Sequence, residues 1–114
     1  MKTERQDDSM RTLEFVVTGQ TLEQKPDCDF SGLVSGSDGY IYAKFYFSED
    51  WSGCSKTVEF SSGNHDYPSQ MLNRSDECKI PQEALARTIF RIQVIGKKSN
   101  LKLTTNRLLV TQRR

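Results

Sequence analysis

The chain has 114 residues, which is the size of one domain and leaves little room for two. Its 16 basic and 15 acidic residues nearly balance, so charge gives no general drive toward nucleic acid or an anionic membrane. Aromatic residues make up 10% of the chain, which disfavours a disordered protein. No apolar run approaches the roughly 20 residues that a membrane-spanning helix needs.

The first residues differ in character from the rest. Residues 1–12 are polar and charged and are predicted to form a flexible arm, followed by a single domain over residues 13–112. The arm lacks the apolar stretch of a secretory signal peptide, so we expect the protein to be made in a cytoplasm.

The first predicted strand covers residues 13–18, which are rich in β-branched residues and end at Gly19. Residues 21–29 contain Pro26 and suit a loop or an edge strand. Residues 30–39 contain three glycines among serine and aspartate, which predicts a loop.

Residues 40–47 are the clearest predicted strand. Apolar residues alternate with a second set along it, and period-two alternation places the two sets on opposite faces. The predicted core side holds Ile41, Ala43, Phe45 and Phe47. The predicted outer side holds Tyr40, Tyr42, Lys44 and Tyr46.

The second half of the chain alternates short strand and turn signals. Trp51 lies in a predicted turn, where we expect its ring to pack over one end of the core with its N–H satisfied. Pro81 suits the first position of a one-turn helix, and residues 96–100 predict a turn. The predicted strands are residues 55–60, 67–72, 77–80, 89–95, 101–104 and 107–111.

This succession predicts an all-β sandwich or barrel of seven to eight short antiparallel strands with at most one helical turn. An immunoglobulin-like β-sandwich is the favoured form. The spacing of Cys28, Cys54 and Cys78 provides no CxxC pair for zinc, and free thiols are favoured over a disulfide in a reducing compartment.

The residues that could serve catalysis or metal binding are better explained by structural roles. His65 is the only histidine and lies in a loop beside Asp66, without a positioned nucleophile. The carboxylate pairs at residues 49–50 and 76–77 lack the spacing of a calcium loop and suit solvated turns. Nucleotide-binding and hydrolase motifs do not occur, so we predict no catalytic residue, no metal ligand, no cofactor and no enzyme activity.

The outward residues Tyr40, Tyr42, Lys44 and Tyr46 are the candidate interaction face. Such a strand could stack single-stranded nucleic acid or sugar. Outward tyrosines on a sandwich more often cover a sheet or form a protein interface, which is the favoured interpretation.

Four segments together resemble a known family. They are residues 43–53 (AKFYFSEDWSG), 56–60 (KTVEF), 76–81 (DECKIP) and 103–106 (LTTN). In this order they resemble the immunoglobulin-like N-terminal domain of baseplate upper and tail-fibre proteins from phages and prophages of Gram-positive bacteria. The matched positions have structural roles, and the expected fold determinants are Phe45, Phe47, Trp51, Phe60, Ile80, Pro81, Phe90 and Asn106. Asn106 is expected to satisfy backbone groups at a bend.

The resemblance implies a phage or prophage structural protein that acts by protein–protein contact, in the bacterial host cytoplasm during synthesis and then in the virion tail. Expected partners are tail or baseplate proteins or a host protein, with a homo-oligomer left open and neither membrane nor nucleic acid favoured. The length of the chain motivates an alternative, a free-standing phage-encoded inhibitor of a bacterial defence protein, of the anti-CRISPR type.

Overall fold

The computed structural model describes residues 10–114, so most of the predicted N-terminal arm lies outside the described residues. Two of its residues belong to the fold instead: Arg11 and Thr12 open strand β1 (Arg11–Thr18). The Arg11 amide donates to the Tyr40 carbonyl at 2.8 Å, and its guanidinium donates to the Asp29 and Ser31 carbonyls at 2.8 and 2.7 Å. These long-range contacts extend the strand two residues beyond the apolar pattern.

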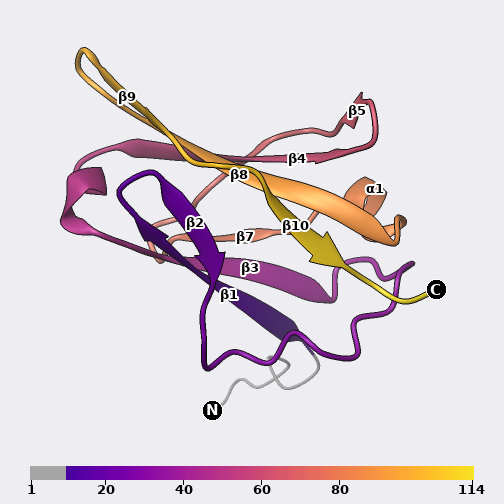
Figure 1. Cartoon of the computed structure of the whole chain (residues 1–114). Coiled ribbons are helices and arrows are strands. Elements are labelled where there is room, and N and C mark those ends of the chain that lie inside the picture. Colours follow the sequence, from indigo (N-terminus) through magenta and orange to yellow (C-terminus); the bar gives the residue numbers. More distant parts are fainter. Residues whose placement is uncertain (1–9) are drawn as a thin grey trace.

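Two sheets pack face to face, which confirms the predicted all-β sandwich (Figure 1). The first has the order β2-β1-β3-β7, and the second runs β10-β8-β4-β5, with β6 paired to β4 and β9 to β8. The remaining strand bounds are β2 (Thr21–Gln24), β3 (Ile41–Phe47), β4 (Ser55–Ser62), β5 (His65–Asp66), β6 (Gln70–Met71), β7 (Glu77–Lys79), β8 (Ile89–Lys98), β9 (Leu101–Thr104) and β10 (Leu108–Thr111). These strands outnumber the seven or eight predicted because part of the segment 21–29 forms the edge strand β2, and the predicted loop around His65 contains the two-residue strand β5.

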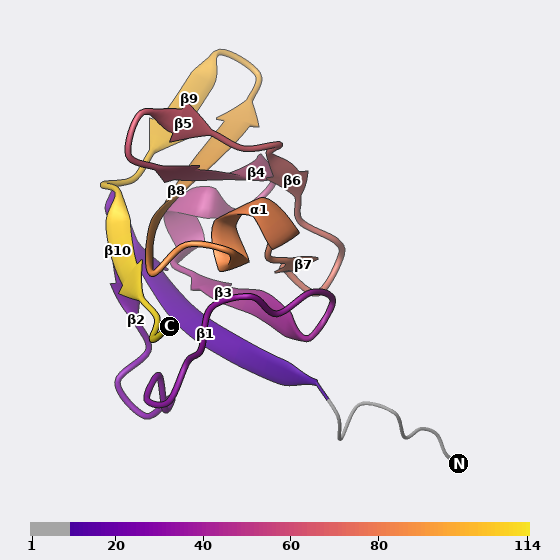
Figure 2. The same ribbon diagram turned by 90° about the vertical axis from the view of Figure 1, so that its right-hand side faces the viewer.

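One pairing differs from the all-antiparallel prediction. Strands β1 and β3 are parallel, with Arg11 opposite Ile41 and Val17 opposite Phe47. The chain first turns back from β1 into β2, which occupies one side of β1. The long loop after β2 then returns the chain to the start of β1, so β3 runs in the same direction on the other side (Figure 2).

The core between the sheets is built around aromatic rings. Phe15 of β1 stacks on Phe45 of β3 with ring centroids 5.1 Å apart, and Phe60 lies 6.5 Å from Phe90 across the second sheet. Most of the expected fold determinants are buried here, namely Phe45, Trp51, Phe60, Ile80, Pro81 and Phe90. Phe47 is partly buried and packs against the same core.

Trp51 closes one end of the sandwich, as expected from its place in a turn. It ends the 3-10 helix η2 (Glu49–Trp51), is fully buried, and donates its indole N–H to the Gly19 carbonyl at 2.7 Å. The ring lies against Gly96, where an added Cβ would approach Trp51 Cζ3 to 2.6 Å. The prediction of a turn beginning at Gly96 is therefore wrong: this glycine allows a ring to pack on β8, which continues to Lys98.

The helix α1 (Gln82–Leu85) follows Pro81, close to the predicted position. Pro81 precedes the helix instead of occupying its first position, and its carbonyl accepts from the amides of Ala84 and Leu85 at 3.0 and 3.1 Å. Helices long and apolar enough to cross a membrane are absent from the described part of the chain.

Asn106 joins the two sheets at one side of the sandwich. Its Oδ1 accepts from the Leu22 amide at 2.7 Å, and its Nδ2 donates to the Leu22 carbonyl at 3.2 Å. Its own amide donates to the Gln20 carbonyl at 3.3 Å. The expectation that Asn106 satisfies backbone groups is confirmed, and the groups belong to a strand 84 positions away.

Replacing Asn106 tests this link. We expect Asn106→Ala to lower the free energy of unfolding by about 1–3 kcal/mol, because both backbone groups of Leu22 lose their partner in a partly buried place. Urea unfolding measures the change. The control is Asn64→Ala, which changes an exposed residue in the turn between β4 and β5. Equal effects of the two substitutions would show that the Asn106 contacts do not stabilise the fold.

Candidate functional site

The outer side of β3 holds three of the four predicted interaction residues. Tyr42, Lys44 and Tyr46 alternate with the buried Ile41, Ala43 and Phe45, as predicted. The parallel register places Glu14 of β1 opposite Lys44 and Val16 opposite Tyr46. We call the side chains of Glu14, Tyr42, Lys44 and Tyr46 the tyrosine face.

Tyr46 is the centre of the tyrosine face, and 38% of it is exposed. Its hydroxyl donates to Glu14 Oε2 at 2.7 Å. The ammonium groups of Lys44 and Lys25 lie 5.4 and 5.5 Å from the centroid of its ring. These distances are within the range of a cation–π contact, so the ring is held by charges from several elements.

The hydrogen bond to Glu14 raises the pKa of Tyr46, because the carboxylate is a partner for the protonated phenol. We expect Glu14→Gln to lower this pKa toward its ordinary value of 10.0, as measured by a pH titration of the tyrosine ring resonances. The pKa of Tyr46 is higher in the folded chain than in the unfolded chain. The hydrogen bond to Glu14 therefore stabilises the fold below pH 10, and this stabilisation is lost as the pH rises through the folded-state pKa of Tyr46.

The matched control for this titration is Glu23→Gln, which removes an exposed carboxylate from β2. Its titration curve for Tyr46 should overlay that of the unchanged protein. A Tyr46 curve that is the same in Glu14→Gln as in the control would contradict the assigned hydrogen bond.

The other members of the predicted face are less closely grouped. Lys44 Nζ donates to the Ser75 carbonyl at 2.8 Å. Tyr42 lines a hollow of about 410 Å³ together with Met10, Thr12 and Glu77. Tyr40 is 44% exposed but precedes β3, which begins at Ile41, so it lies beyond the end of the strand.

A second hollow opens beside the buried tryptophan. Its volume is about 460 Å³, and residues from β3, η2 and β4 line it. Lys56 lies between two partners there: its Nζ is 3.3 Å from Asp76 Oδ1 and 4.8 Å from the centroid of the Phe47 ring. The cation and the carboxylate thus partner each other.

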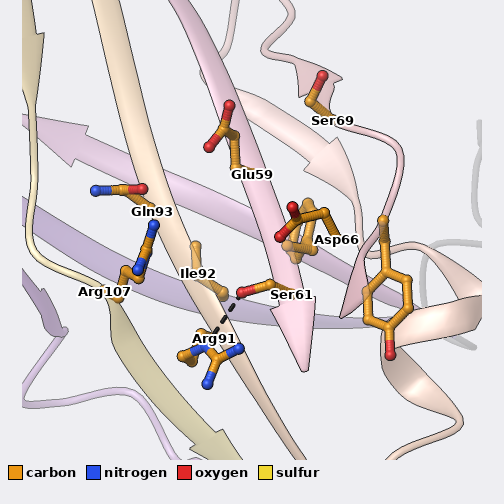
Figure 3. Close-up of a pocket in the computed structure, with 10 residues that line it drawn as sticks. Glu59, Ser61, Asp66, Ser69, Arg91, Ile92, Gln93 and Arg107 are labelled. Carbon is orange, nitrogen blue, oxygen red and sulfur yellow. Dashed lines mark hydrogen bonds between the residues drawn. The ribbon is translucent and has the colours of Figure 1, made fainter. Parts of the chain in front are cut away.

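The opposite sheet carries a charged pocket that the sequence did not predict. It has a volume of about 220 Å³ and lies on the outer side of β4 and β8 (Figure 3). Arg91 is fixed in it by hydrogen bonds to Ser61 Oγ at 3.1 Å and the Gly63 carbonyl at 2.6 Å. The charged residues that line it are Glu59, Asp66, Arg91 and Arg107.

These four charged residues come from four separate parts of the chain, which is why no motif revealed the pocket. Following the sheet order β10-β8-β4-β5, the two arginines lie at the β10 and β8 side and the two acids at the β4 and β5 side. Within residues 10–114 none of the four forms an ion pair with another. The pocket therefore presents separated charges of both signs.

The residues considered for catalysis come from separate elements, and of them only Glu49 and Asp76 line the same hollow. His65 is exposed in β5 and pairs with Ser62 through the backbone. Glu49 and Asp50 are exposed in η2, whereas Glu77 lies in β7. Groups of three or more potential metal ligands are absent from residues 10–114.

The three cysteines are free thiols. Cys78 is buried, and burial raises the pKa of its thiol to about 12, so it stays protonated at neutral pH. Cys28 Sγ accepts a hydrogen bond from the Glu14 amide at 3.4 Å. Cys54 is half-buried near Gly96.

Comparison with known proteins gave no relative of this chain: no protein-family model, no curated protein and no solved structure matches it.

Proposed function

We propose that the chain is a structural protein of a phage or prophage particle, of the tail or baseplate type, which acts by protein–protein contact through the tyrosine face. The observation that carries the choice of surface is Tyr46, an exposed aromatic ring fixed by Glu14, Lys44 and Lys25 on a rigid sheet. Tyrosine held in this way is typical of protein interfaces, because a fixed ring loses little entropy on binding.

The cations around Tyr46 favour a protein partner over a stacked ligand. A base or a sugar that stacked on the ring would have to displace an ammonium group that lies 5.4 or 5.5 Å from the ring centroid. A protein surface can instead contact the exposed part of the ring and place a carboxylate or a carbonyl beside Lys44. The tyrosine face offers a hydroxyl, a carboxylate and an ammonium for such contacts.

The assignment to a phage particle rests on the resemblance of residues 43–53, 56–60, 76–81 and 103–106 to the baseplate and tail-fibre domain. It is tested by quantitative mass spectrometry of purified particles from a host that encodes the chain. We expect the chain at a fixed copy number relative to tail proteins. Absence from particles, together with binding to a host defence nuclease, would overturn the proposal in favour of the inhibitor alternative.

The tyrosine face itself is tested by Tyr42→Ala with Tyr46→Ala. We expect at least a tenfold lower incorporation of the double variant into particles, because an anchoring ring at the centre of an interface contributes about 2 kcal/mol or more. The matched control is Met71→Ala, which removes the most exposed hydrophobic side chain of the other sheet, at 71% exposure. Thermal unfolding must show that both variants fold. Unchanged incorporation of the folded double variant would exclude this surface.

A further inference from the structure

The outermost strands of the two sheets differ in how their backbone groups are used. Unpaired N–H and C=O groups on an edge strand can accept a strand from another chain. On β2, Asn106 takes both groups of Leu22. On β7, the Glu77 amide donates to Asn73 Oδ1 at 3.0 Å, and the Glu77 carbonyl accepts from the Asn73 backbone amide at 3.1 Å. On each edge of the first sheet, an asparagine thus takes the outward backbone groups of one residue.

The second sheet has protected segments as well. On β9 the Thr104 carbonyl accepts from Gln20 Nε2 at 3.1 Å, and the exposed Lys102 adds a charge that opposes strand pairing. At the opposite edge, β5 and β6 have two residues each and Pro68 lies between them. Short strands and proline are further ways of blocking an edge.

Strand β10 lacks these protections. The Gln112 amide donates to the Thr88 carbonyl at 2.6 Å, so even-numbered positions of β10 face β8. The alternation of an antiparallel pair then turns the backbone groups of Arg107, Leu109 and Thr111 outward. Within residues 10–114 these outward groups receive no hydrogen bond. No charged residue lies within Leu108–Thr111.

The same edge already pairs with a loop segment at Arg113, two residues beyond the end of β10. The Arg113 amide donates to the Leu33 carbonyl at 2.7 Å, and the Ser35 amide donates to the Arg113 carbonyl at 2.6 Å. This is a parallel bridge between Val34 and Arg113. The edge geometry is thus suited to pairing, and the chain's own loop occupies only its end.

The side chains around this edge indicate what kind of segment could pair with β10. Leu109 is 56% exposed, and Ile89, which pairs with Thr111 in the neighbouring strand β8, is 48% exposed. Arg107 lines the charged pocket at its β10 side. Residues 107–114 contain three arginines and no acidic residue. Pairing with a second copy would bring these arginines together, which like-charge repulsion disfavours.

We propose that the edge of β10 binds an extended acidic segment of a partner protein by strand addition. The backbone of the segment pairs with the outward groups of Arg107, Leu109 and Thr111, an apolar side chain covers Leu109, and an acidic one lies at Arg107. This surface belongs to the second sheet, so the inference is independent of the tyrosine face.

The probe is a blocked seven-residue peptide in which glutamate alternates with valine, titrated into the isotope-labelled chain and followed by NMR. We expect saturable shifts and slower hydrogen exchange at the amides of Leu109 and Thr111. Replacing each glutamate with lysine should weaken binding at least tenfold, as should Arg107→Glu. The control Arg74→Glu changes an exposed arginine in a turn before β7 and should leave binding unchanged.

Dependence on backbone pairing has its own test. Leu109→Pro removes one outward N–H, whereas Leu109→Thr keeps it, so only the first should abolish the amide shift at Thr111. A peptide N-methylated at alternate residues provides the same test with the protein unaltered, and it should not bind. Equal binding of the lysine or N-methylated peptide, no shift at Leu109 and Thr111, or dimerisation through β10 in light scattering would overturn the proposal.

Discussion

Trp51→Ala is expected to lower the free energy of unfolding by about 3–5 kcal/mol, the range for removing a large aromatic side chain from a packed core. Trp51 is fully buried, contacts Phe47 with ring centroids 5.2 Å apart, and covers the end of both sheets. The substitution also leaves the Gly19 carbonyl without its indole partner. Urea unfolding with tryptophan-independent detection by circular dichroism measures the change.

Trp51→Phe separates packing from hydrogen bonding in this prediction. Phenylalanine retains much of the apolar volume but cannot donate to Gly19, so we expect a smaller loss than for alanine. A loss below about 1 kcal/mol for Trp51→Ala would contradict the role of the ring in closing the core.

Gly96→Ala is the second large effect, and it acts through the same ring. The added Cβ would lie 2.6 Å from Trp51 Cζ3 and 2.7 Å from Cε3, which is well inside contact distance, so β8 or the indole must move. Overpacking of this kind costs about 1–3 kcal/mol. Chemical unfolding of the variant gives the value.

A double-mutant cycle distinguishes this clash from a general effect of alanine on the strand. In a Trp51→Leu background the ring is gone, so Gly96→Ala should cost less than in the unchanged protein. If Gly96→Ala lowers the free energy of unfolding equally in the two backgrounds, the close approach to Trp51 does not restrict position 96 to glycine.

Much of the sandwich could be predicted because its strands have one buried side. In β3 and β8 the alternation of apolar and other residues marks the core side directly, and Phe45, Phe90 and Ile92 are buried as it predicts. The position of Trp51 over the core end also followed from its place in a short turn.

Strand direction and glycine function were harder to predict. Alternation is the same for parallel and antiparallel pairs, so nothing in residues 11–18 or 41–47 indicated the parallel pairing of β1 with β3. Gly96 resembled a turn residue because a missing side chain in a strand and a turn glycine look alike in sequence. Its role depends on a ring 45 positions away, which only the packing reveals.

The candidate surfaces, too, could be predicted from the sequence only in part. Tyr42, Lys44 and Tyr46 could be grouped in advance because they lie on one strand at alternate positions. Their partners Glu14 and Lys25 come from other elements and could not be assigned. The charged pocket and the open edge of β10 depend entirely on strand order, since Glu59, Arg91 and Arg107 meet only after the second sheet has formed.

The central claim, docking through the tyrosine face, is tested most directly by photo-crosslinking within assembled particles. A benzoylphenylalanine placed at Tyr40, which is exposed and precedes Tyr42 of the tyrosine face by two residues, should form an adduct with one particle protein. The same group at the exposed Met71 of the other sheet should not. Crosslinks of equal yield from both positions, or none from Tyr40 in particles that contain the chain, would contradict the account.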